Sequence, residues 1–466
     1  MLFFLQKRVF WWHALLAFVD FVLLVACVYL AVLVRFDGRL GATAGFSGAL
    51  AWRAPVVGAV LVLAIAAMGL YQVRLRMSWR GRTVRQLVAF FVGWIVLSAA
   101  YYLAPDLYLG RGVLGIALPL GFIAIAAWRA VFLAAVDTDL FKRRVLVLGA
   151  GQRASEIAYK MRRRTDQRGF KILGYVPIGS DPVVVPESSL VSPGEPLSRW
   201  APRHQVDEIV VGPDDRRGTV DLEDLLGCRR RGIAVTEIAD FFEREAGNII
   251  MDLTNPSWLV FSQGFSTSRG HLFVKRLFDV AVASLVALLT WPFMLLVALA
   301  IRLESGKGSP ILYKQVRVGE NGRQFELLKF RSMRVDAERD GVARWASVHD
   351  ARVTRVGRAI RKTRLDELPQ LWNVLRGDMS IVGPRPERPQ FVAEFSERIR
   401  YYQLRHCVKP GLTGWAQLRY PYGSSQRDAE EKLKFDLFYV KNKNIIFDLA
   451  ILVQTAEVVV FGRGAR

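Results

Sequence analysis

Cysteine is scarce in this sequence of 466 residues, and acidic residues are few relative to basic ones. The three cysteines, Cys27, Cys228 and Cys407, show no CxxC spacing, which argues against a disulfide scaffold and a structural zinc site. The 42 acidic residues are outnumbered by 64 Lys and Arg, which gives a net charge of +22. Hydrophobic residues nevertheless make up 52% of the chain, and this excludes a disordered polyelectrolyte. The length excludes a single small domain, because one core stops growing beyond about 250–300 residues.

Four apolar runs precede residue 140, at His13–Val34, Ala49–Leu70, Val84–Leu103 and Val113–Ala135. Each is close to the roughly 20 residues that a helix needs to cross a bilayer. We therefore predict a four-helix transmembrane bundle over residues 1–140, the alternative being four buried helices of a soluble protein. Basic residues gather between the second and third runs and from Lys142 onward. By the positive-inside rule the N-terminus, that connection and everything after Lys142 face the cytoplasm.

Residues 141–265 have the pattern of a soluble α/β domain. Short apolar runs at Val145–Leu148, Ile172–Val176 and Glu208–Val211 indicate buried strands, and a helical pattern runs to Met161. Strands that alternate with helices indicate a parallel sheet. We predict a Rossmann-like domain for this segment.

A glycine-rich turn, Gly149-x-Gly151-x-x-Ala154, lies between the first strand and the first helix. In this position backbone amides and the helix dipole can hold a pyrophosphate, so Gly149 and Gly151 are candidate cofactor-binding residues. The expected ribose-binding acid is not convincing, because Asp166 comes early and lies among arginines. Two interpretations stay open: the turn binds a nucleotide, or it is a remnant of the fold used for packing or regulation.

The fifth apolar run, Val280–Ile301, contains no charged residue. Its length alone predicts a fifth crossing, which would place the basic segment after Arg302 outside the cell. Pro292 lies in the middle of the run, where proline removes a backbone hydrogen bond and kinks a helix. A re-entrant helix at about 278–302, which enters and leaves the membrane by the same face, reconciles these observations.

Two adjacent acids, Asp366 and Glu367, follow a short basic segment that ends at Arg364. Helical spacing relates Leu365, Leu368, Leu371 and Leu375, so one helix face should pack while the acids lie near its edge. The plain alternative is a solvated helix face on which Arg364 pairs with Glu367.

Rigid cations accompany the acids. Arg385 lies between Pro384 and Pro386, whose fixed φ reduces the backbone freedom lost when the guanidinium binds a ligand. Its planar fork of donors suits phosphate oxygens. Lys329 and Arg331 form a second cationic cluster after an apparent strand. Acids among so many cations are expected to have lowered pKa values. The pattern indicates phosphoryl chemistry on a lipid-borne phosphate.

Six sequence blocks carry a resemblance to a known family. They are Lys275-Arg276-x-Phe278-Asp279, Lys329-Phe330-Arg331-Ser332-Met333, Arg364-x-Asp366-Glu367-Leu368-Pro369-Gln370-x-x-Asn373, Arg376-Gly377-Asp378-Met379-Ser380, Gly383-Pro384-Arg385-Pro386 and Lys409-Pro410-Gly411-x-Thr413-Gly414-x-x-Gln417. In this order they resemble the bacterial sugar transferase family, the monotopic phosphoglycosyl transferases that start exopolysaccharide and O-antigen assembly. The helices and the Rossmann-like segment upstream resemble its long-form members. The subgroup linked to exosortase (PEP-CTERM) systems is the one we suggest.

The resemblance implies that residues 270–466 form an α/β catalytic domain that contains the re-entrant helix. It implies transfer of a sugar-1-phosphate from a UDP-sugar to polyprenyl (undecaprenyl) phosphate, with release of UMP. Asp366 would attack the β-phosphate and form a covalent aspartyl-phosphosugar, Glu367 would be the second catalytic residue, and both would lie near Mg²⁺. The phosphate- and substrate-binding residues would be Lys329, Arg331, Arg364, Gln370, Asn373, Arg376 and Arg385. Similar proteins often have Ser-Pro at the kink, so Thr290 is the candidate here for the missing hydroxyl.

We expect a multi-pass protein of the bacterial inner (cytoplasmic) membrane, a homodimer with cytoplasmic soluble domains. The arginines cluster beside apolar segments, so membrane lipid rather than nucleic acid is the expected partner of the basic charge. One alternative is a membrane-bound nucleotide-sugar oxidoreductase or epimerase that uses the glycine turn, although no Tyr-x-x-x-Lys pair accompanies it. The other is a non-catalytic scaffold for a polysaccharide complex, which gives no reason for acids and rigid arginines to converge. The sequence does not identify the sugar.

Overall fold

The computed structural model describes residues 7–36, 44–71, 79–135, 142–161, 169–179, 181–215, 220–251, 268–306, 308–335, 337, 350, 352–420, 423 and 425–460. Asp166 and the domain boundary predicted at residue 265 lie outside this part of the chain. The chain forms two compact units, Met1–Ala246 and Gly247–Arg466. The domain boundaries at residues 140 and 265 stay predictions.

All four N-terminal apolar runs are helices, and each is long and apolar enough to cross a membrane. They are α1 (Lys7–Arg35), α2 (Ala44–Ala67), α3 (Trp79–Leu103) and α4 (Arg111–Ala135). Helix α1 contacts α2 and α4, and α3 contacts the same two helices. Asp20 in α1 is fully buried and accepts hydrogen bonds from Arg129 Nη2 at 2.6 Å and from the Tyr71 hydroxyl at 2.8 Å. Charged residues within apolar helices are costly unless paired, so this contact fastens α1 to α4.

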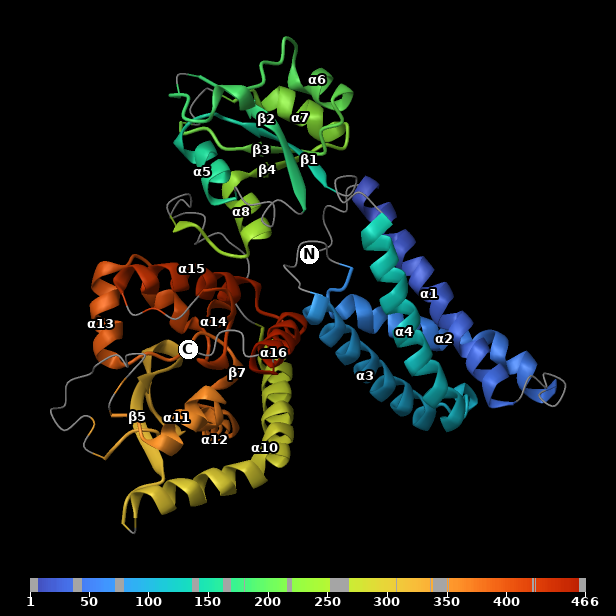
Figure 1. Ribbon diagram of the computed structural model, residues 1–466. Coiled ribbons are helices and arrows are strands. Elements are labelled where there is room, and N and C mark those ends of the chain that lie inside the picture. The colour runs from blue at the N-terminus through green and yellow to red at the C-terminus, as the bar shows by residue number, and fades with distance from the viewer. Residues whose placement is uncertain are drawn as a thin grey trace. The chain divides into compact units, whose positions relative to one another are not determined.

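The α/β part of the first unit is a parallel four-stranded sheet of order β2-β1-β3-β4. Its strands are β1 (Arg143–Leu148), β2 (Phe170–Val176), β3 (Glu208–Val211) and β4 (Ala234–Glu237). Helices α5 (Gln152–Lys160) and α8 (Ile238–Ala246) cover one face, and α6 (Leu197–Arg203) and α7 (Leu222–Arg230) cover the other (Figure 1). The predicted strands and parallel sheet are confirmed, while β4 was not predicted.

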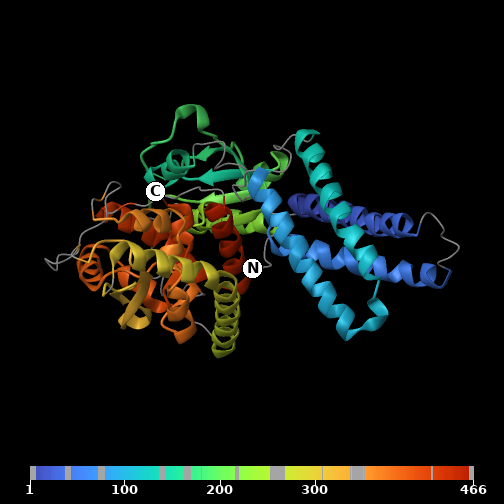
Figure 2. The ribbon, with the colours of Figure 1, turned by 60° about the horizontal axis from the view of Figure 1, so that its bottom comes forward.

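The second unit contains a bent apolar helix, α10 (Arg269–Ser305), in which Pro292 lies. Figure 1 and Figure 2 both show α10 as two arms that meet at a sharp bend. In the first arm, Ala283 belongs to a core shared with the strands and helices of the C-terminal region; in the second arm, Val297 and Ile301 belong to a different core. Both arms therefore pack on the same compact unit. The Thr290 hydroxyl donates to the Val286 carbonyl at 2.7 Å, as expected for the residue next to the kink.

The rest of the second unit surrounds two small sheets. Strands β5 (Leu312–Val318) and β6 (Gln324–Phe330) form an antiparallel hairpin, and β7 (Ser380–Val382) pairs in parallel with β8 (Gly411–Thr413). The helices are α11 (Arg355–Lys362), α12 (Gln370–Arg376), α13 (Pro389–Arg398), α14 (Trp415–Arg419), α15 (Gln426–Asn442) and α16 (Ile445–Val460). Leu371, Val374, Met379 and Ile381 belong to the same core as Ala283 of α10, so the segment that follows the acids is anchored.

A buried polar network ties the first arm of α10 to this core. Lys275 Nζ lies 2.8 Å from Asp279 and 2.9 Å from Asp448. Asp279 also accepts a hydrogen bond from the Ser380 hydroxyl at 3.0 Å, and Asp448 accepts one from the Tyr439 hydroxyl at 2.9 Å. Buried charges persist where they are paired and hydrogen-bonded. The first sequence block thus has a structural role.

Candidate active site

The two acids lie on a tight turn rather than in one long helix. Leu365–Glu367 form a 3₁₀ turn, η7, and α12 starts only at Gln370. The single helix predicted from the leucine spacing is wrong, because Pro369 has no N–H to donate to the Leu365 carbonyl. That carbonyl accepts from Leu368 N instead. Arg364 enters the turn in the left-handed region, with φ at 61°.

Three cations from three segments converge on one oxygen of Glu367. Its Oε1 accepts hydrogen bonds from Arg385 Nη2 at 2.9 Å and Lys329 Nζ at 3.3 Å, and Arg364 Nη1 lies 3.9 Å away. Burial alone would raise the pKa of Glu367, but Arg385, Lys329 and Arg364 together hold it below its usual range. Glu367 therefore stays ionised and holds the cations in place. The pairing with Arg364 that the plain alternative expected exists, but it is the longest of the three contacts.

Asp366 differs from its neighbour in its contacts and in the direction of its pKa shift. It is 8% exposed, and among the described residues no side chain or amide is hydrogen-bonded to its carboxylate. Burial, followed by repulsion from Glu367, raises its pKa, against the pull of Lys329, Arg361 and Arg364. The expectation that surrounding cations lower the pKa of both acids is wrong for Asp366, because burial and repulsion from Glu367 outweigh the effect of those cations. A carboxylate with a raised pKa and no hydrogen bond is the more nucleophilic of the two.

Lys329 and Arg331 both come from the end of β6. Burial lowers the pKa of Lys329, and the Glu367 carboxylate opposes that effect. Arg331 is 6% exposed, and within the described part of the chain its Nη1 and Nη2 atoms have no hydrogen-bond partner. A buried guanidinium remains charged and is costly without an anion. Arg331 is therefore suited to a phosphate group, and phosphate binding by it stays a prediction.

The segment that carries Arg385 is fixed through three successive carbonyls. Gly411 N donates to the Pro384 carbonyl at 2.9 Å, Arg405 Nη2 to the Arg385 carbonyl at 2.9 Å, and Arg317 Nη1 to the Pro386 carbonyl at 3.1 Å. Arg385 is consequently presented to Glu367 from a rigid backbone. Sequence reasoning found the flanking prolines but missed Arg405 and Arg317, because no motif or periodicity distinguishes them from surface arginines.

The other predicted substrate-binding residues have different surroundings. Asn373 is fully buried; its Oδ1 accepts from Leu328 N and its Nδ2 donates to the Glu326 carbonyl, so it fastens α12 to β6. Gln370 is buried at the start of α12, next to the acid turn. Arg376 is exposed at the end of α12, and within the described residues no hydrogen bond or ion pair links it to the acids. Substrate binding by these three stays a prediction.

Asp366 and Glu367 are not equally suited to bind Mg²⁺. Magnesium takes hard oxygen ligands and is often bound by one or two carboxylates together with substrate phosphates. Asp366 fits this role, because its carboxylate has no hydrogen bond within the described residues and a nearby cation would favour its ionised form. Glu367 fits this role poorly, because its Oε1 already accepts hydrogen bonds from Arg385 and Lys329.

The glycine-rich turn lies in the first unit and is closed by a carboxylate of the chain itself. Asp214 accepts hydrogen bonds from Gln152 N at 2.7 Å and Arg153 N at 2.8 Å, the amides that would face a pyrophosphate. Gly149 has φ at 119°, and a Cβ at Gly151 would lie 2.1 Å from Asp214 Oδ2. These contacts favour the interpretation of the turn as a packing element, while cofactor binding by the two glycines stays a prediction.

Comparison with known proteins gives the family. The model of the family described as bacterial sugar transferase matches residues 270–462. A UDP-N-acetylgalactosamine-undecaprenyl-phosphate N-acetylgalactosaminephosphotransferase of Aeromonas hydrophila is 40% identical over 242 residues, which cover 52% of this chain and 56% of the relative. An undecaprenyl-phosphate glucose phosphotransferase of Komagataeibacter xylinus is 35% identical over 70% of this chain and 61% of its own.

The chain thus spans between half and two thirds of the length of these two relatives. A third relative is similar along most of both chains. This UDP-glucose:undecaprenyl-phosphate glucose-1-phosphate transferase of Xanthomonas campestris pv. campestris is 31% identical over 397 residues, 81% of each chain. Together with the order of the six sequence blocks, this similarity shows that the chain belongs to the bacterial sugar transferase family.

Proposed function

We propose that this protein transfers a sugar-1-phosphate from a UDP-sugar to polyprenyl (undecaprenyl) phosphate and releases UMP. This would be the first membrane step in the assembly of an exopolysaccharide, capsule or O-antigen. The observation that carries the proposal is the asymmetry of the acid pair. Glu367 is neutralised by Arg385 and Lys329, whereas Asp366 beside it is buried, with a raised pKa. One carboxylate holds the phosphate-binding cations, and the other is left to react.

The reaction would take place in two displacements. In the first, an Asp366 oxygen forms a bond to the β-phosphorus and the bond between that phosphorus and the bridging oxygen breaks, so that UMP leaves with the electron pair. In the second, an oxygen of the lipid phosphate attacks the same phosphorus and the Asp366 carboxylate is regenerated. Dividing the transfer lets one carboxylate serve a soluble donor and a membrane acceptor in turn. Mg²⁺ would neutralise diphosphate charge next to Asp366.

The bent helix supports the membrane part of the proposal. On its outward side, Leu288, Leu289, Leu295 and Leu296 are each more than 60% exposed, as expected for side chains in lipid. Leu365, from the acid turn, packs against the core that contains Val297 and Ile301 of the second arm. Leu368 packs against this core and against the core that contains Ala283 of the first arm. A re-entrant α10 would therefore hold Asp366 and Glu367 at the membrane surface, where a lipid phosphate lies. Together with the positive-inside rule, this topology would put the soluble regions on the cytoplasmic side of the inner membrane.

Cysteine labelling tests the topology. The background is Cys407→Ser, because Cys407 is the exposed native thiol among the described residues. Single cysteines then replace Arg229, before α10, and Pro310, after it, and both positions are exposed. A re-entrant helix predicts that a membrane-impermeant maleimide labels both in inside-out vesicles and neither in intact cells. Labelling from opposite sides would show that α10 crosses the membrane.

Intact-protein mass spectrometry tests the chemistry. The purified protein is mixed with a panel of UDP-sugars and Mg²⁺, without the lipid acceptor. We expect the wild type to gain the mass of a sugar phosphate with one of the donors and to lose it when polyprenyl phosphate is added, with UMP released in the first step. UMP release that requires the lipid, with no adduct at any time, would favour direct attack by the lipid phosphate.

The two alternative functions have less support. An oxidoreductase or epimerase would need the glycine turn for its cofactor, and Asp214 already accepts the hydrogen bonds of its amides. A scaffold would not need Arg385 and Lys329 to meet on one half-buried carboxylate. The homodimer and the exosortase-linked subgroup stay predictions.

A further inference from the structure

Helix α11 has one apolar side and one basic side, and it contains no acidic residue. Val356 and Ile360 pack in the core that also contains residues of the second arm of α10. Spacings of three and four residues place a second set of side chains together on the opposite side of the helix. They form the basic face of α11, which consists of the exposed residues Arg355, Arg358 and Lys362.

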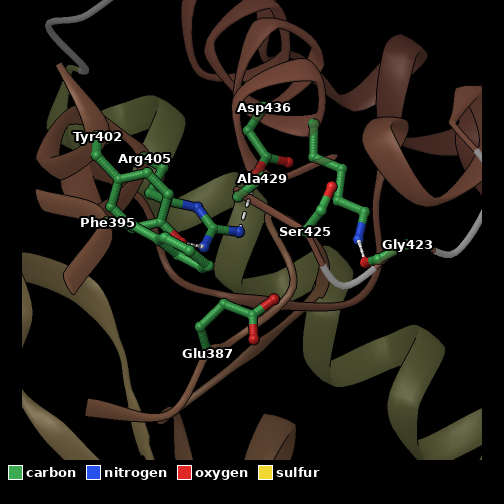
Figure 3. Close-up of a pocket in the computed structure, with 9 residues that line it drawn as sticks. Glu387, Phe395, Tyr402, Arg405, Gly423, Ser425, Ala429 and Asp436 are labelled. Atoms are coloured by element: carbon green, nitrogen blue, oxygen red, sulfur yellow. Dashed lines mark hydrogen bonds and ion pairs between the residues drawn. The ribbon is translucent and has the colours of Figure 1, made fainter. Parts of the chain in front are cut away.

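The side chains of the basic face have no ion pair or hydrogen bond within the described part of the chain. Elsewhere in the second unit, two largely buried cations are paired with acids. Lys275 Nζ lies 2.8 Å from Asp279, and Figure 3 shows Arg405 next to Asp436, to which its Nη2 atom donates at 2.8 Å. The three exposed charges of α11 are therefore left for an anionic partner outside the fold.

Both ends of α11 are fixed to segments that the proposed function puts at the membrane surface. At the N-terminus, the Glu304 carboxylate, from the last turn of the second arm, accepts a hydrogen bond from Arg355 N at 2.8 Å. At the C-terminus, Thr363 ends the helix and Arg364 leads into the acid turn. A helix of eight residues is about 12 Å long. It would therefore lie along the membrane surface, between the end of the arm and the acids.

The arm beside α11 (Figure 1) has the exposed apolar side that would lie in lipid. Leu296, Leu299 and Leu303 are 62%, 56% and 75% exposed and recur at helical spacing. Leu303 directly precedes Glu304, so the basic face begins where these leucines end. Long cationic side chains at such a boundary extend their charges into the headgroup layer, where anionic lipids attract them.

We propose that the basic face of α11 docks on the headgroups of anionic phospholipids, and that this contact holds the acid turn in place at the membrane. The inference rests on the proposed function, because a re-entrant α10 sets the depth of α11. The phosphate of the lipid acceptor is a different ligand, since the basic face points away from the core on which Leu365 of the acid turn packs. Bilayer charge would thus control turnover through three residues outside the six sequence blocks.

UMP release by the full-length protein in lipid nanodiscs tests the docking. The discs contain phosphatidylcholine, with or without phosphatidylglycerol, and a constant amount of polyprenyl phosphate. One cation near an anionic surface is worth about fivefold in binding, so phosphatidylglycerol should increase UMP release by wild type at least about fivefold. High salt should reduce this increase.

Variants assign the effect to α11. The triple variant Arg355→Gln, Arg358→Gln, Lys362→Gln should lose the increase and match wild type in neutral discs, and Arg358→Gln alone should lose part of it. The matched control removes three other exposed cations of the second unit and should keep the full increase; it consists of Arg323→Gln, Arg398→Gln and Arg400→Gln.

A nitroxide label at Ala359→Cys, an exposed position of α11, measures the docking without turnover. The background is again Cys407→Ser, and the label's collisions with a water-soluble nickel chelate are recorded. The chelate is uncharged, so that bilayer charge does not change its local concentration. Collisions should decrease when phosphatidylglycerol is added to wild type, and they should not change in the triple variant.

Three results separate the possibilities. Unchanged collisions in wild type, or an equal increase of UMP release in the triple variant, would overturn the proposal. A raised KM of the triple variant for polyprenyl phosphate in neutral discs would also overturn it, because the cations would then bind the acceptor. Collisions that respond to phosphatidylglycerol in a protein that releases no UMP from any UDP-sugar would refute the proposed function and leave this surface standing.

Discussion

Replacing each acid by its amide should change stability in opposite directions, although the two residues are adjacent. In Asp366→Asn the buried charge disappears, and with it the cost that raises the pKa of Asp366. In Glu367→Gln the carboxylate that binds Arg385 and Lys329 disappears. We expect Asp366→Asn to be as stable as wild type or more so, and Glu367→Gln to be less stable.

The magnitudes follow from burial. Each pKa unit corresponds to about 1.4 kcal/mol of difference between the two protonation states, which sets the scale of the gain in Asp366→Asn. The Lys329 and Arg385 side chains are 20% and 31% exposed, so their contacts with Glu367 lie between surface and buried ion pairs. We expect Glu367→Gln to cost about 1–3 kcal/mol. For a unit of this size, that is a fall in Tm of roughly 2–4 °C for each kcal/mol.

The dependence on pH separates the two effects. The pKa of Glu367 is lowered by folding, so its stabilising contribution is present above its ordinary value of about 4.3 and is lost as the pH falls further. The pKa of Asp366 is raised, so the gain in Asp366→Asn is present at neutral pH and is lost as the pH falls through that raised value.

Thermal unfolding of the detergent-solubilised variants between pH 3 and 8 measures both effects, alongside UMP release. Both variants should lose activity, Asp366→Asn most completely, with no sugar-phosphate adduct. Glu326→Gln, which removes an exposed ion pair on β6, is the control and should change Tm little. Equal destabilisation by the two amides would refute our assignment of different environments, and near wild-type turnover by Asp366→Asn would refute the covalent mechanism.

Three further predictions concern other parts of the chain. Lys329→Met removes a cation that lowers the pKa of Asp366, so the acid limb of the pH profile of kcat/KM should move to higher pH. An unchanged limb would contradict the idea that ionisation of Asp366 sets this limb. Pro292→Leu should straighten α10 and reduce UMP release in membranes, because the acids lose their depth, whereas full activity would show that the kink is dispensable. Gly151→Val should push Asp214 from the helix amides and lower the thermal stability of the first unit while turnover persists; abolished turnover in a folded protein would favour a bound cofactor.

Several features of this protein were determined by the sequence alone. The N-terminal helices and the strands β1 to β3 could be predicted because hydrophobic periodicity and run length are local properties. The acids and the cations near them could also be predicted, because side-chain chemistry and a backbone fixed by proline are properties of short segments. The bend of α10 could likewise be predicted from Pro292, because the missing N–H is a property of one residue.

The tertiary structure alone decided how the surroundings of the two acids differ. Asp366 and Glu367 are neighbours of similar chemistry in the sequence, and only folding brings Lys329 and Arg385 to Glu367. Asp366 beside it has no hydrogen bond to its carboxylate among the described residues, and burial raises its pKa. The same is true of Asp214, which lies 63 residues after Gly151 and fills the place expected for a phosphate. Such contacts join segments far apart in the chain, and their energies depend on distance and burial, which no local pattern encodes.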